Sequence, residues 1–350
     1  MSRFVIASLA LMLALIVAAS VYLSGPIFDE RLAAAPSTAL AIAPIGRAVT
    51  LARSQDGAVL LVTSANADGI SAVNLNAYFS RNFDDAVQAY SSLGMERLVR
   101  VFAQAPMMQV VPWEALTAPL PSSERAIAAG TNYAEHAREV GHAGEPFLFP
   151  KLSAPSAWNA GVHAGARLDY EIELCVVPLT DYVAGARIEL GYILCNDFTD
   201  RWLLVRDIDL DGPMGRSGFA LGKGGDTRMP VGPLLVIPRG TDFYLGLELS
   251  LYVNDRLRQR TLANQMIWAP EIILRESLQQ CANQYDSAGA VVTLADCDRI
   301  SAGSVIMTGT PAGVLFKPAT LWAPWAYLRA GDVVKGFGTH LGMLENTVVK

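Results

Sequence analysis

Strand-like apolar runs between Gly- and Pro-rich turns dominate the chain after about residue 125, and this pattern constrains the fold most. In the clearest run, apolar residues at every second position from Leu247 to Val253 lie on one face of a strand. In this part of the chain, Ala269–Asn283 has the period of an amphipathic helix. We therefore predict an α+β fold that is mainly β, a roll or barrel. The predicted strands are Asp169–Leu179, Glu189–Phe198, Gly232–Pro238, Leu245–Asp255 and the start of Ser304–Val314.

The region before this block has a different composition. Ala58–Ser64 is a short apolar run typical of a strand, and Asn82–Phe102 begins with a helical period. Prolines at positions 112, 119 and 121 then interrupt the chain. We predict a small α+β domain over residues 45–120 and a catalytic domain over residues 121–350.

The first residues form an uncharged apolar run, Phe4–Leu23, which as a helix would span about 30 Å, the thickness of a bilayer core. Arg3 before it and acidic residues after it favour an external C-terminal part. We predict a signal anchor or a cleaved signal peptide over residues 1–25, an Ala/Pro-rich linker over 26–44, and a catalytic domain that is membrane-anchored in the periplasm or otherwise extracytoplasmic, or else secreted. A buried core helix is the weaker alternative.

Composition excludes several classes of protein. With 52% hydrophobic and 17% charged residues, most of the 350 residues can form a core, which excludes intrinsic disorder. A net charge of −6 without a basic cluster argues against nucleic-acid binding. The four cysteines form no CxxC pair, so a zinc ribbon or thioredoxin motif is not expected. We interpret them as buried hydrophobic residues, with a Cys281–Cys297 disulfide as the alternative.

Three carboxylates are candidates for a metal site. Glu171 and Glu173 are two residues apart in a predicted strand, so they share one face. Their strand is otherwise apolar, and two buried anions are costly without a compensating cation. Asp197 follows another apolar run. An all-oxygen trio suits Mg²⁺, or Mn²⁺ or Ca²⁺, better than Zn²⁺. A solvated strand face is the alternative, and a thiolate from Cys175 or Cys195 would favour Zn²⁺.

Other polar residues have weaker signals when taken alone. His136 and Glu139 share a face of a short predicted helix, where the pair could activate water or form a plain ion pair. Lys223 is flanked by glycines that let a backbone approach a ligand. The TGTPAG turn, with Gly309 and Thr310, offers N–H groups and a hydroxyl to a carboxylate or enolate oxygen.

Taken in order, these motifs resemble those of the fumarylacetoacetate hydrolase family. The matching stretches run from about residue 130 to residue 346 and are GTNYAEHAREVG, DYEIELCVV, NDFTDR, GKGGDTRMPVGP, LYVNDRLRQ, IMTGTPAGV and LRAGDVVKGFG. The resemblance implies a catalytic β-roll, preceded by a small domain, that commonly forms a homodimer. It also implies activity on small keto acids and 1,3-diketones: hydrolysis of a C–C bond, decarboxylation, isomerisation or hydration.

The resemblance assigns a role to each candidate residue. It implies that Mg²⁺ is bound by the three carboxylates, that the His/Glu pair activates water from a lid segment, and that Lys223 and the TGTPAG turn bind substrate oxygens. It also implies that Arg201 contacts the substrate carboxylate. We therefore expect a metal-dependent hydrolase that cleaves a 2,4-dioxo acid or 1,3-diketone. A decarboxylase, isomerase or hydratase is the alternative, and a membrane-tethered binding protein without activity is a third possibility.

One part of the family pattern is altered. The run after NDFTDR has Trp202 where the family often has an acid and Leu204 where it often has Gln. The loss of an amide removes a polar contact with the substrate. We expect either a less polar substrate or a site that has lost activity.

Overall fold

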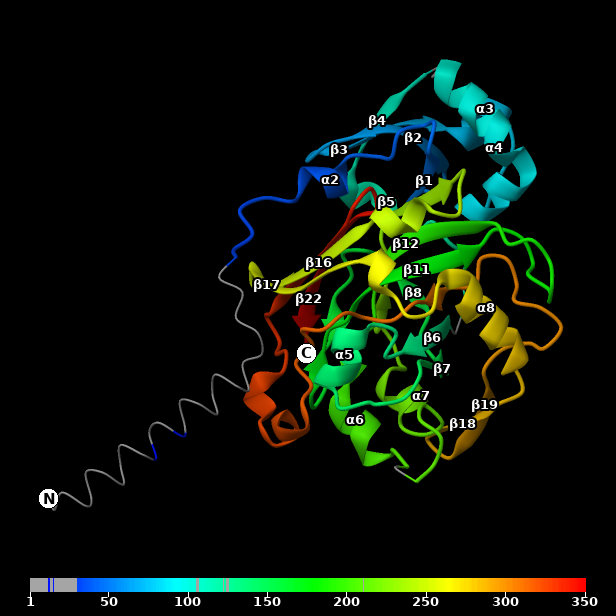
Figure 1. The fold of residues 1–350 in the computed structure, drawn as a ribbon. Helices are drawn as coiled ribbons and strands as arrows, with labels where there is room; N and C mark the ends of the chain where they lie inside the picture. The colour runs from blue at the N-terminus through cyan, green and yellow to red at the C-terminus, as the bar shows by residue number, and fades with distance from the viewer. Residues whose placement is uncertain are drawn as a thin grey trace, which may run out of the picture.

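The computed structural model describes residues 30–350, apart from 105–106, 122, 124–125 and 210, together with Met12 and Leu15. Its centre is one long, mostly antiparallel sheet of eleven strands (Figure 1). In spatial order these are β4 (Gln109–Pro112), β3 (Gly69–Asn74), β2 (Val59–Ala65), β1 (Ala48–Ser54), β15 (Leu234–Pro238), β12 (Leu190–Asn196), β11 (Ile172–Pro178), β20 (Ile306–Met307), β6 (Ala126–Gly130) and β7 (Phe147–Lys151), with β5 (Leu116–Thr117) paired to β1.

A second sheet of five strands packs against this one. Gly336 makes the close approach possible, because a Cβ on it would lie 2.6 Å from Cδ1 of Ile172 in β11. The sheet contains β17 (Arg256–Leu262), β16 (Glu248–Val253), β21 (Val333–Gly338), β22 (Gly342–Val349) and β9 (Val162–His163). The short strand pairs are β10 (Leu168–Asp169) with β13 (Thr199–Asp200), β8 (Pro155–Ser156) with β14 (Met229–Pro230), and β18 (Gln284–Ser287) with β19 (Ala290–Thr293).

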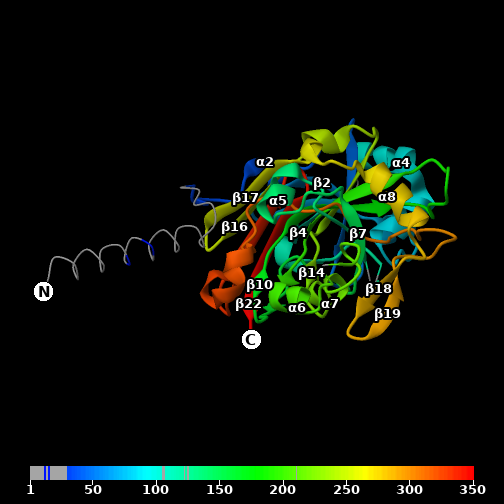
Figure 2. The ribbon, with the colours of Figure 1, turned by 60° about the horizontal axis from the view of Figure 1, so that its bottom comes forward.

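Helices are few and mostly short, as the sequence predicts. In Figure 2, α6 and α7 lie side by side at the lower edge of the molecule. In the described part of the chain the helices are α2 (Ser37–Leu40), α3 (Leu75–Phe79), α4 (Ala86–Gln104), α5 (Ala134–Glu139), α6 (Arg201–Arg206), α7 (Phe219–Gly222) and α8 (Pro270–Gln279). Single 3-10 turns cover Trp113–Ala115, Phe243–Gly246, Ala263–Gln265, Pro318–Trp322 and Pro324–Ala326. The mixed, mainly β fold class is confirmed.

The predicted small domain and the predicted catalytic domain share one sheet. β1, from the predicted small domain, pairs with β15 of the catalytic domain over five residue pairs, so one sheet crosses the predicted boundary at residue 120. The predicted linker also contributes to the core, and the predicted domain bounds stay predictions. Within it, Ala39 and Ala43 are buried, and Ala39 packs with Tyr252 and Phe337 on the outer face of the second sheet. This cover explains why β16 is buried on both faces, although its sequence alternates.

The predicted N-terminal hydrophobic helix requires a correction. Its residues, Phe4–Leu23, lie outside the described part of the chain apart from Met12 and Leu15. Within the described part, no helix combines the length and the apolar composition that a membrane crossing requires.

Candidate active site

The three predicted carboxylates meet where two neighbouring strands run side by side. Glu171 precedes β11, Glu173 lies within it, and Asp197 follows β12; the register pairs Glu173 with Cys195. The backbone N–H of Asp197 donates to the Glu171 carbonyl over 2.8 Å. All three side chains are buried, and one oxygen from each lies within 4.8 Å of the others. The period-two argument is therefore sound, because both glutamates face the same space.

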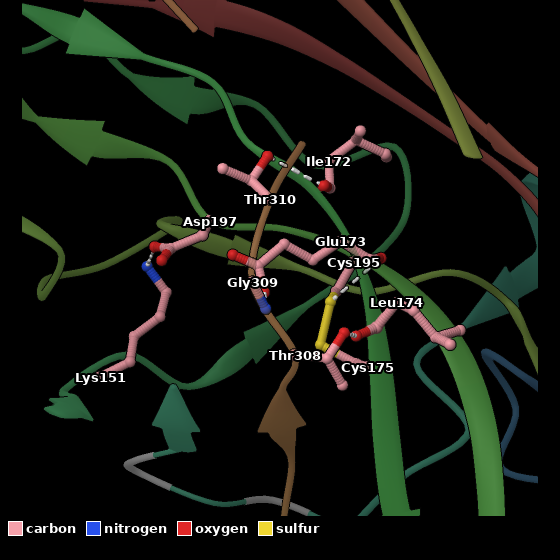
Figure 3. Close-up of a disulfide and its surroundings, with 10 residues drawn as sticks. All are labelled: Lys151, Ile172, Glu173, Leu174, Cys175, Cys195, Asp197, Thr308, Gly309 and Thr310. Atoms are coloured by element: carbon pink, nitrogen blue, oxygen red, sulfur yellow. Dashed lines mark hydrogen bonds and ion pairs between the residues drawn. A yellow bond between two sulfur atoms is a disulfide. The ribbon is translucent and has the colours of Figure 1, made fainter. Parts of the chain in front are cut away.

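Glu173 is the carboxylate without a basic partner. It accepts a hydrogen bond of 2.7 Å from the Gly309 N–H, and no Lys, Arg or His nitrogen in the described residues lies within ion-pair distance. Burial raises the pKa of Glu173 well above its usual value, and the charges of Asp197 and Glu171 raise it further. In Figure 3 its carboxylate is turned toward the side where Asp197 lies. The local charge balance therefore lacks a cation at this point.

The other two carboxylates are bound by buried lysines. Nζ of Lys223 donates to Glu171 over 2.7 Å, to Asp197 over 2.8 Å and to the Thr199 hydroxyl over 2.9 Å. Nζ of Lys151 donates to the other oxygen of Asp197 over 2.5 Å (Figure 3). Burial raises the pKa of Glu171, but Lys223 and the nearby Arg201 outweigh it and lower this pKa to about 2. Glu171 is therefore ionised at neutral pH.

Arg201 completes the cluster through a fourth acid. Its Nε donates to Asp169 over 2.8 Å, and one of its terminal nitrogens donates to Glu171. Asp169 also accepts the backbone N–H groups of Leu315 and Phe316, over 2.9 and 3.0 Å. The predicted substrate-binding guanidinium is thus fixed by two carboxylates, while part of it still lines the cavity described below.

The charges and the donor atoms of the buried cluster fit one divalent cation. Four carboxylates face three basic side chains, so the cluster carries one excess negative charge when all seven groups are ionised, as they would be around a bound cation. The donors of the trio are all oxygen, which is the set that hard cations bind. The alternative of a thiolate ligand is excluded, because both nearby sulfurs form a disulfide. The trio therefore fits a divalent cation such as Mg²⁺, Mn²⁺ or Ca²⁺. The four acids are Asp169, Glu171, Glu173 and Asp197, and the three bases are Lys151, Arg201 and Lys223.

The predicted water-activating pair lies on α5. Nδ1 of His136 is 3.4 Å from a carboxylate oxygen of Glu139, and the residue is 5% exposed. Because this carboxylate can only accept, a proton on Nδ1 is favoured and Nε2 keeps its lone pair. The Gly313 N–H donates to both Glu139 oxygens, over 3.2 and 3.0 Å. Gly313 has φ +111°, and a Cβ there would lie 2.1 Å from the Arg258 carbonyl oxygen, so only glycine fits this tether.

The TGTPAG turn holds neighbouring strands of the site in place and also contributes to the wall of the cavity. The Gly309 amide is used by Glu173, and the Thr310 hydroxyl donates to the Ile172 carbonyl over 3.1 Å (Figure 3). Asn132, from the GTNY motif, donates to the Thr308 carbonyl over 2.8 Å and so ties the start of α5 to the turn. Thr310 lines the cavity and Gly309 does not. Their predicted roles as direct substrate ligands stay predictions.

A cavity of about 330 Å³ opens onto this cluster. The predicted residues His136, Glu171, Arg201, Lys223 and Thr310 line it, and so does Leu204, which stands at the altered position of the family pattern. Close packing of α7 against α6 shapes this wall. A Cβ on Gly222 would lie 2.5 Å from Cβ of Leu204, so the glycines of GFALGKGG allow the two helices to meet.

Sequence reasoning missed three buried residues of the site. Lys151 is buried at the end of β7, and no pattern in the sequence marks it. Asn132 acts through its carboxamide at a turn, which only the three-dimensional contacts reveal. Asp169 had a usable signal, because it precedes Glu171 by two residues and extends the same period.

The cysteines form two disulfides. Cys281–Cys297, the predicted alternative, is present. Cys175 and Cys195, interpreted as separate buried residues, are also joined, which corrects that interpretation. Their strands pair with Glu173 opposite Cys195, so the bridge lies two residues from both Glu173 and Asp197 (Figure 3). Burial alone could not distinguish a thiol from a half-cystine, because both are apolar and both are found in cores.

The curated relatives match this chain over most of their own length. Oxaloacetate tautomerase YisK of Bacillus subtilis (strain 168) is 30% identical over 252 residues, which are 67% of this chain and 72% of the relative. The mitochondrial oxaloacetate tautomerase FAHD2B of Bos taurus is 30% identical over 266 residues, which are 71% of this chain and 74% of the relative.

The predicted location is corrected by these findings. We expected a catalytic domain anchored to a membrane outside the cytoplasm, or secreted. The described helices include none that could span a membrane, and the FAHD2B relative is mitochondrial by name. The expectation rested on the apolar length of Phe4–Leu23 and on the charges that flank it, and this segment lies outside the described part of the chain apart from Met12 and Leu15.

Solved structures and a family model agree on the fold. The fumarylacetoacetate hydrolase of psychrophilic Exiguobacterium antarcticum has a TM-score of 0.56 at 23% identity, over 87% of this chain and 99% of its own. The maleylpyruvate hydrolase of Sphingobium sp. SYK-6 has a TM-score of 0.56 at 22% identity, over 86% and 99%. Residues 125–349, more than half of the chain, match the family model described as fumarylacetoacetate (FAA) hydrolase C-terminal. The chain therefore belongs to the fumarylacetoacetate hydrolase family, as its motifs predict.

Proposed function

We propose that this protein hydrolyses the C–C bond between C3 and C4 of a small 2,4-dioxo acid, an acylpyruvate. The observation that carries the proposal is the presence of His136, held by Glu139, on the wall of the cavity that also contains Glu171. An acidic cluster without a base would suit a decarboxylase, whereas hydrolysis needs a group that takes a proton from water.

Glu171, Glu173 and Asp197 would hold the divalent cation. When bound, the cation supplies Lewis acidity toward the oxygens of the 2-oxo acid end. Mg²⁺ is our first choice among the hard cations. The ammonium of Lys223 contributes a second positive charge on the same side of the cavity, where negative charge develops on the departing pyruvate unit.

The dyad performs the proton transfers. Nε2 of His136 takes a proton from water, and the water oxygen forms a bond to C4, the distal carbonyl carbon. The C3–C4 bond then breaks, and its electron pair becomes the enolate of pyruvate. That enolate takes a proton at C3 from the His136 imidazolium. The products are pyruvate and one carboxylic acid, and the net reactant is one water molecule.

A second candidate is keto–enol tautomerisation of a 2-oxo acid. The observation that favours it is the name of two relatives at 30% identity, both oxaloacetate tautomerases. The same imidazole would move a proton between C3 and the enol oxygen, with no bond to C4 formed or broken. The predicted homodimer has no part in either mechanism and stays a prediction.

Turnover of 2,4-dioxo-4-phenylbutanoate by the purified protein with Mg²⁺ separates the two candidates. Hydrolysis removes the ultraviolet absorbance of the conjugated enol and releases pyruvate in equal amount, which a coupled reduction measures. A tautomerase changes the absorbance and releases no pyruvate. Pyruvate release that is unchanged in His136→Ala would overturn the role of the dyad.

A further inference from the structure

We propose that the half of the cavity away from the acidic cluster selects an apolar acyl group, so that the substrate carries a single carboxylate, and that Leu204 sets this preference. The inference rests on the proposed function, because it specifies which acylpyruvates that site takes. A dicarboxylic substrate such as fumarylpyruvate or oxaloacetate would then be disfavoured.

One face of α6 changes from charged to apolar along its length. Arg201 lies at the start of the helix beside the acidic cluster, and Leu204 and Val205 lie one turn further on. Ile208, just after the helix, continues the same face and also lines the cavity. A glutamine in place of Leu204 would put a carboxamide at the point where the charged half of the cavity, the half next to the acidic cluster, ends. Because position 204 is leucine, the residues that follow Arg201 on this wall of the cavity are all apolar.

A second part of the lining is aromatic. The rings of Phe147 and Phe219 are 5.1 Å apart between centroids in a T-shaped arrangement, and those of Phe149 and Phe219 are also 5.1 Å apart. Edge and face contacts of this kind suit a further aromatic ring or an alkyl group. Phe149 also lies under Nζ of Lys223, 5.6 Å from the ring centroid, so the aromatic wall begins directly beside the charged half.

No basic group on these walls is left for a second carboxylate. Arg201 and Lys223 line the cavity, but each is already paired with two buried acids. Among the described residues, the remaining basic side chains of the lining are His136, which belongs to the dyad, and His142, whose Nε2 lies 3.2 Å from the Glu145 carbonyl. A distal carboxylate would lose its hydration against leucine and phenylalanine without a compensating partner.

The charge of the cluster leads to the same conclusion. With a divalent cation bound and all four acids and three bases ionised, the cluster would carry a single positive charge, which the carboxylate at the 2-oxo end balances. A substrate with two carboxylates would bring an unbalanced negative charge into a largely buried cavity. Size also agrees, since about 330 Å³ lies at the lower end of small-ligand sites, which suits a pyruvate unit with a phenyl or short alkyl group.

The first test compares substrates in the wild-type protein. We expect kcat/KM for 2,4-dioxo-4-phenylbutanoate to exceed that for fumarylpyruvate by about tenfold or more, which is the range that a hydrophobic pocket achieves. In Leu204→Gln the ratio should shrink about tenfold. The matched control is Leu203→Gln, the same change one residue away and outside the lining, which should keep the wild-type ratio. Val205→Arg, which supplies the missing cation, should raise turnover of fumarylpyruvate.

Binding of inert analogues tests the inference without turnover. By titration calorimetry with Mg²⁺, 2-oxo-4-phenylbutanoate should bind at least about tenfold more tightly than the dicarboxylate 2-oxoadipate. Equal or tighter binding of the dicarboxylate, or no binding of either, would overturn the inference. Fastest pyruvate release from fumarylpyruvate would overturn it while leaving the proposed hydrolase intact. Preferential binding of the phenyl analogue without pyruvate release from any substrate would support it and overturn the proposed hydrolase instead.

Discussion

The two halves of the cavity are built in opposite ways. In the charged half, each buried ionic side chain is fixed by a partner on another element: Lys223 bridges Glu171 and Asp197, and Arg201 bridges two acids. In the apolar half, leucine and phenylalanine side chains have no directional partners. The first arrangement tolerates almost no substitution, because breaking a buried pair leaves a charge unpaired. The second tolerates changes in shape. We infer that the charged half fixes the reaction and the apolar half fixes the substrate.

The largest expected effect comes from the dyad that acts between the two halves. His136→Ala should lower hydrolysis by about 10²–10⁴-fold, the usual contribution of a general base. Affinity for Mg²⁺ should stay nearly unchanged, because the carboxylates hold the metal. Glu139→Gln should follow the same pattern more mildly. Decarboxylation of a 2-oxo acid, which needs no hydroxide, should survive in both variants. Equal loss of both activities in a folded, metal-loaded His136→Ala protein would mean that the imidazole only positions the substrate.

The next effect is specific to the charged half. Glu173→Gln should weaken Mg²⁺ binding by more than about 100-fold, since even partners of metal ligands typically contribute about 10–100-fold. Calorimetric titration of metal into the protein measures this. A matched change in the apolar half, Val205→Ala, should leave the metal affinity as it is. If both variants bind Mg²⁺ like the wild type, the trio is not the metal site.

The raised pKa of Glu173 predicts how the stability of the metal-free protein depends on pH. Because the folded-state pKa of Glu173 is raised well above 4.5, the folded protein holds a proton that the unfolded chain releases. Stability of the metal-free protein should therefore fall as pH rises from about 4.5 through that folded-state pKa. The lowered pKa of Glu171 acts only below this window. Thermal unfolding in chelator should show this decline in the wild type and a smaller one in Glu173→Gln; parallel curves would contradict the assignment.

The disulfides offer a smaller, paired test. The bridges close loops with separations of 20 and 16 residues, so replacing either pair by alanine should cost about 3 kcal/mol of stability. Only the Cys175–Cys195 bridge joins the strands of Glu173 and Asp197. Its removal should also weaken Mg²⁺ binding, by about tenfold. Loss of the Cys281–Cys297 bridge should leave metal binding unchanged. Equal metal affinities in the two double variants would show that the charged half does not depend on its bridge.

The smallest effect is expected at the mouth of the apolar half. Met214 lines the cavity but is 37% exposed, so it offers little area to a substrate. Met214→Ala should raise KM for the phenyl substrate by no more than about threefold, because few apolar contacts are lost. Its kcat should not change. A loss in kcat would mean that this residue affects the charged half as well.

The sequence predicted the charged half better than the apolar half, for physical reasons. Glu171 and Glu173 were found because strand geometry places alternate residues on one face, and Asp197 because it directly follows a buried strand. Charged residues in apolar runs are conspicuous. Leucine and phenylalanine are not, because they are the ordinary residues of any core; only the departure at Leu204 marked this wall.

Contacts between segments that are distant in the sequence could not be predicted. The pairing of β1 with β15, the cover of β16 by the segment around Ala39, and the salt bridge from Lys151 to Asp197 join residues far apart in the chain. None of these has a local pattern. The location was predicted wrongly for a different reason. A strong local pattern, the apolar run at the N-terminus, was used to infer the location of the whole protein.

The most direct test of the account is isotope transfer from water. The protein is incubated with Mg²⁺ and 2,4-dioxo-4-phenylbutanoate in ¹⁸O-labelled water, and the products are analysed by mass spectrometry. We predict that benzoate and pyruvate form in equal amounts and that benzoate gains one ¹⁸O, because the water activated by His136 attacks the distal carbonyl. The carboxylate of pyruvate should stay unlabelled. Consumption of substrate with no benzoate, or benzoate without the label, would contradict the proposed hydrolysis.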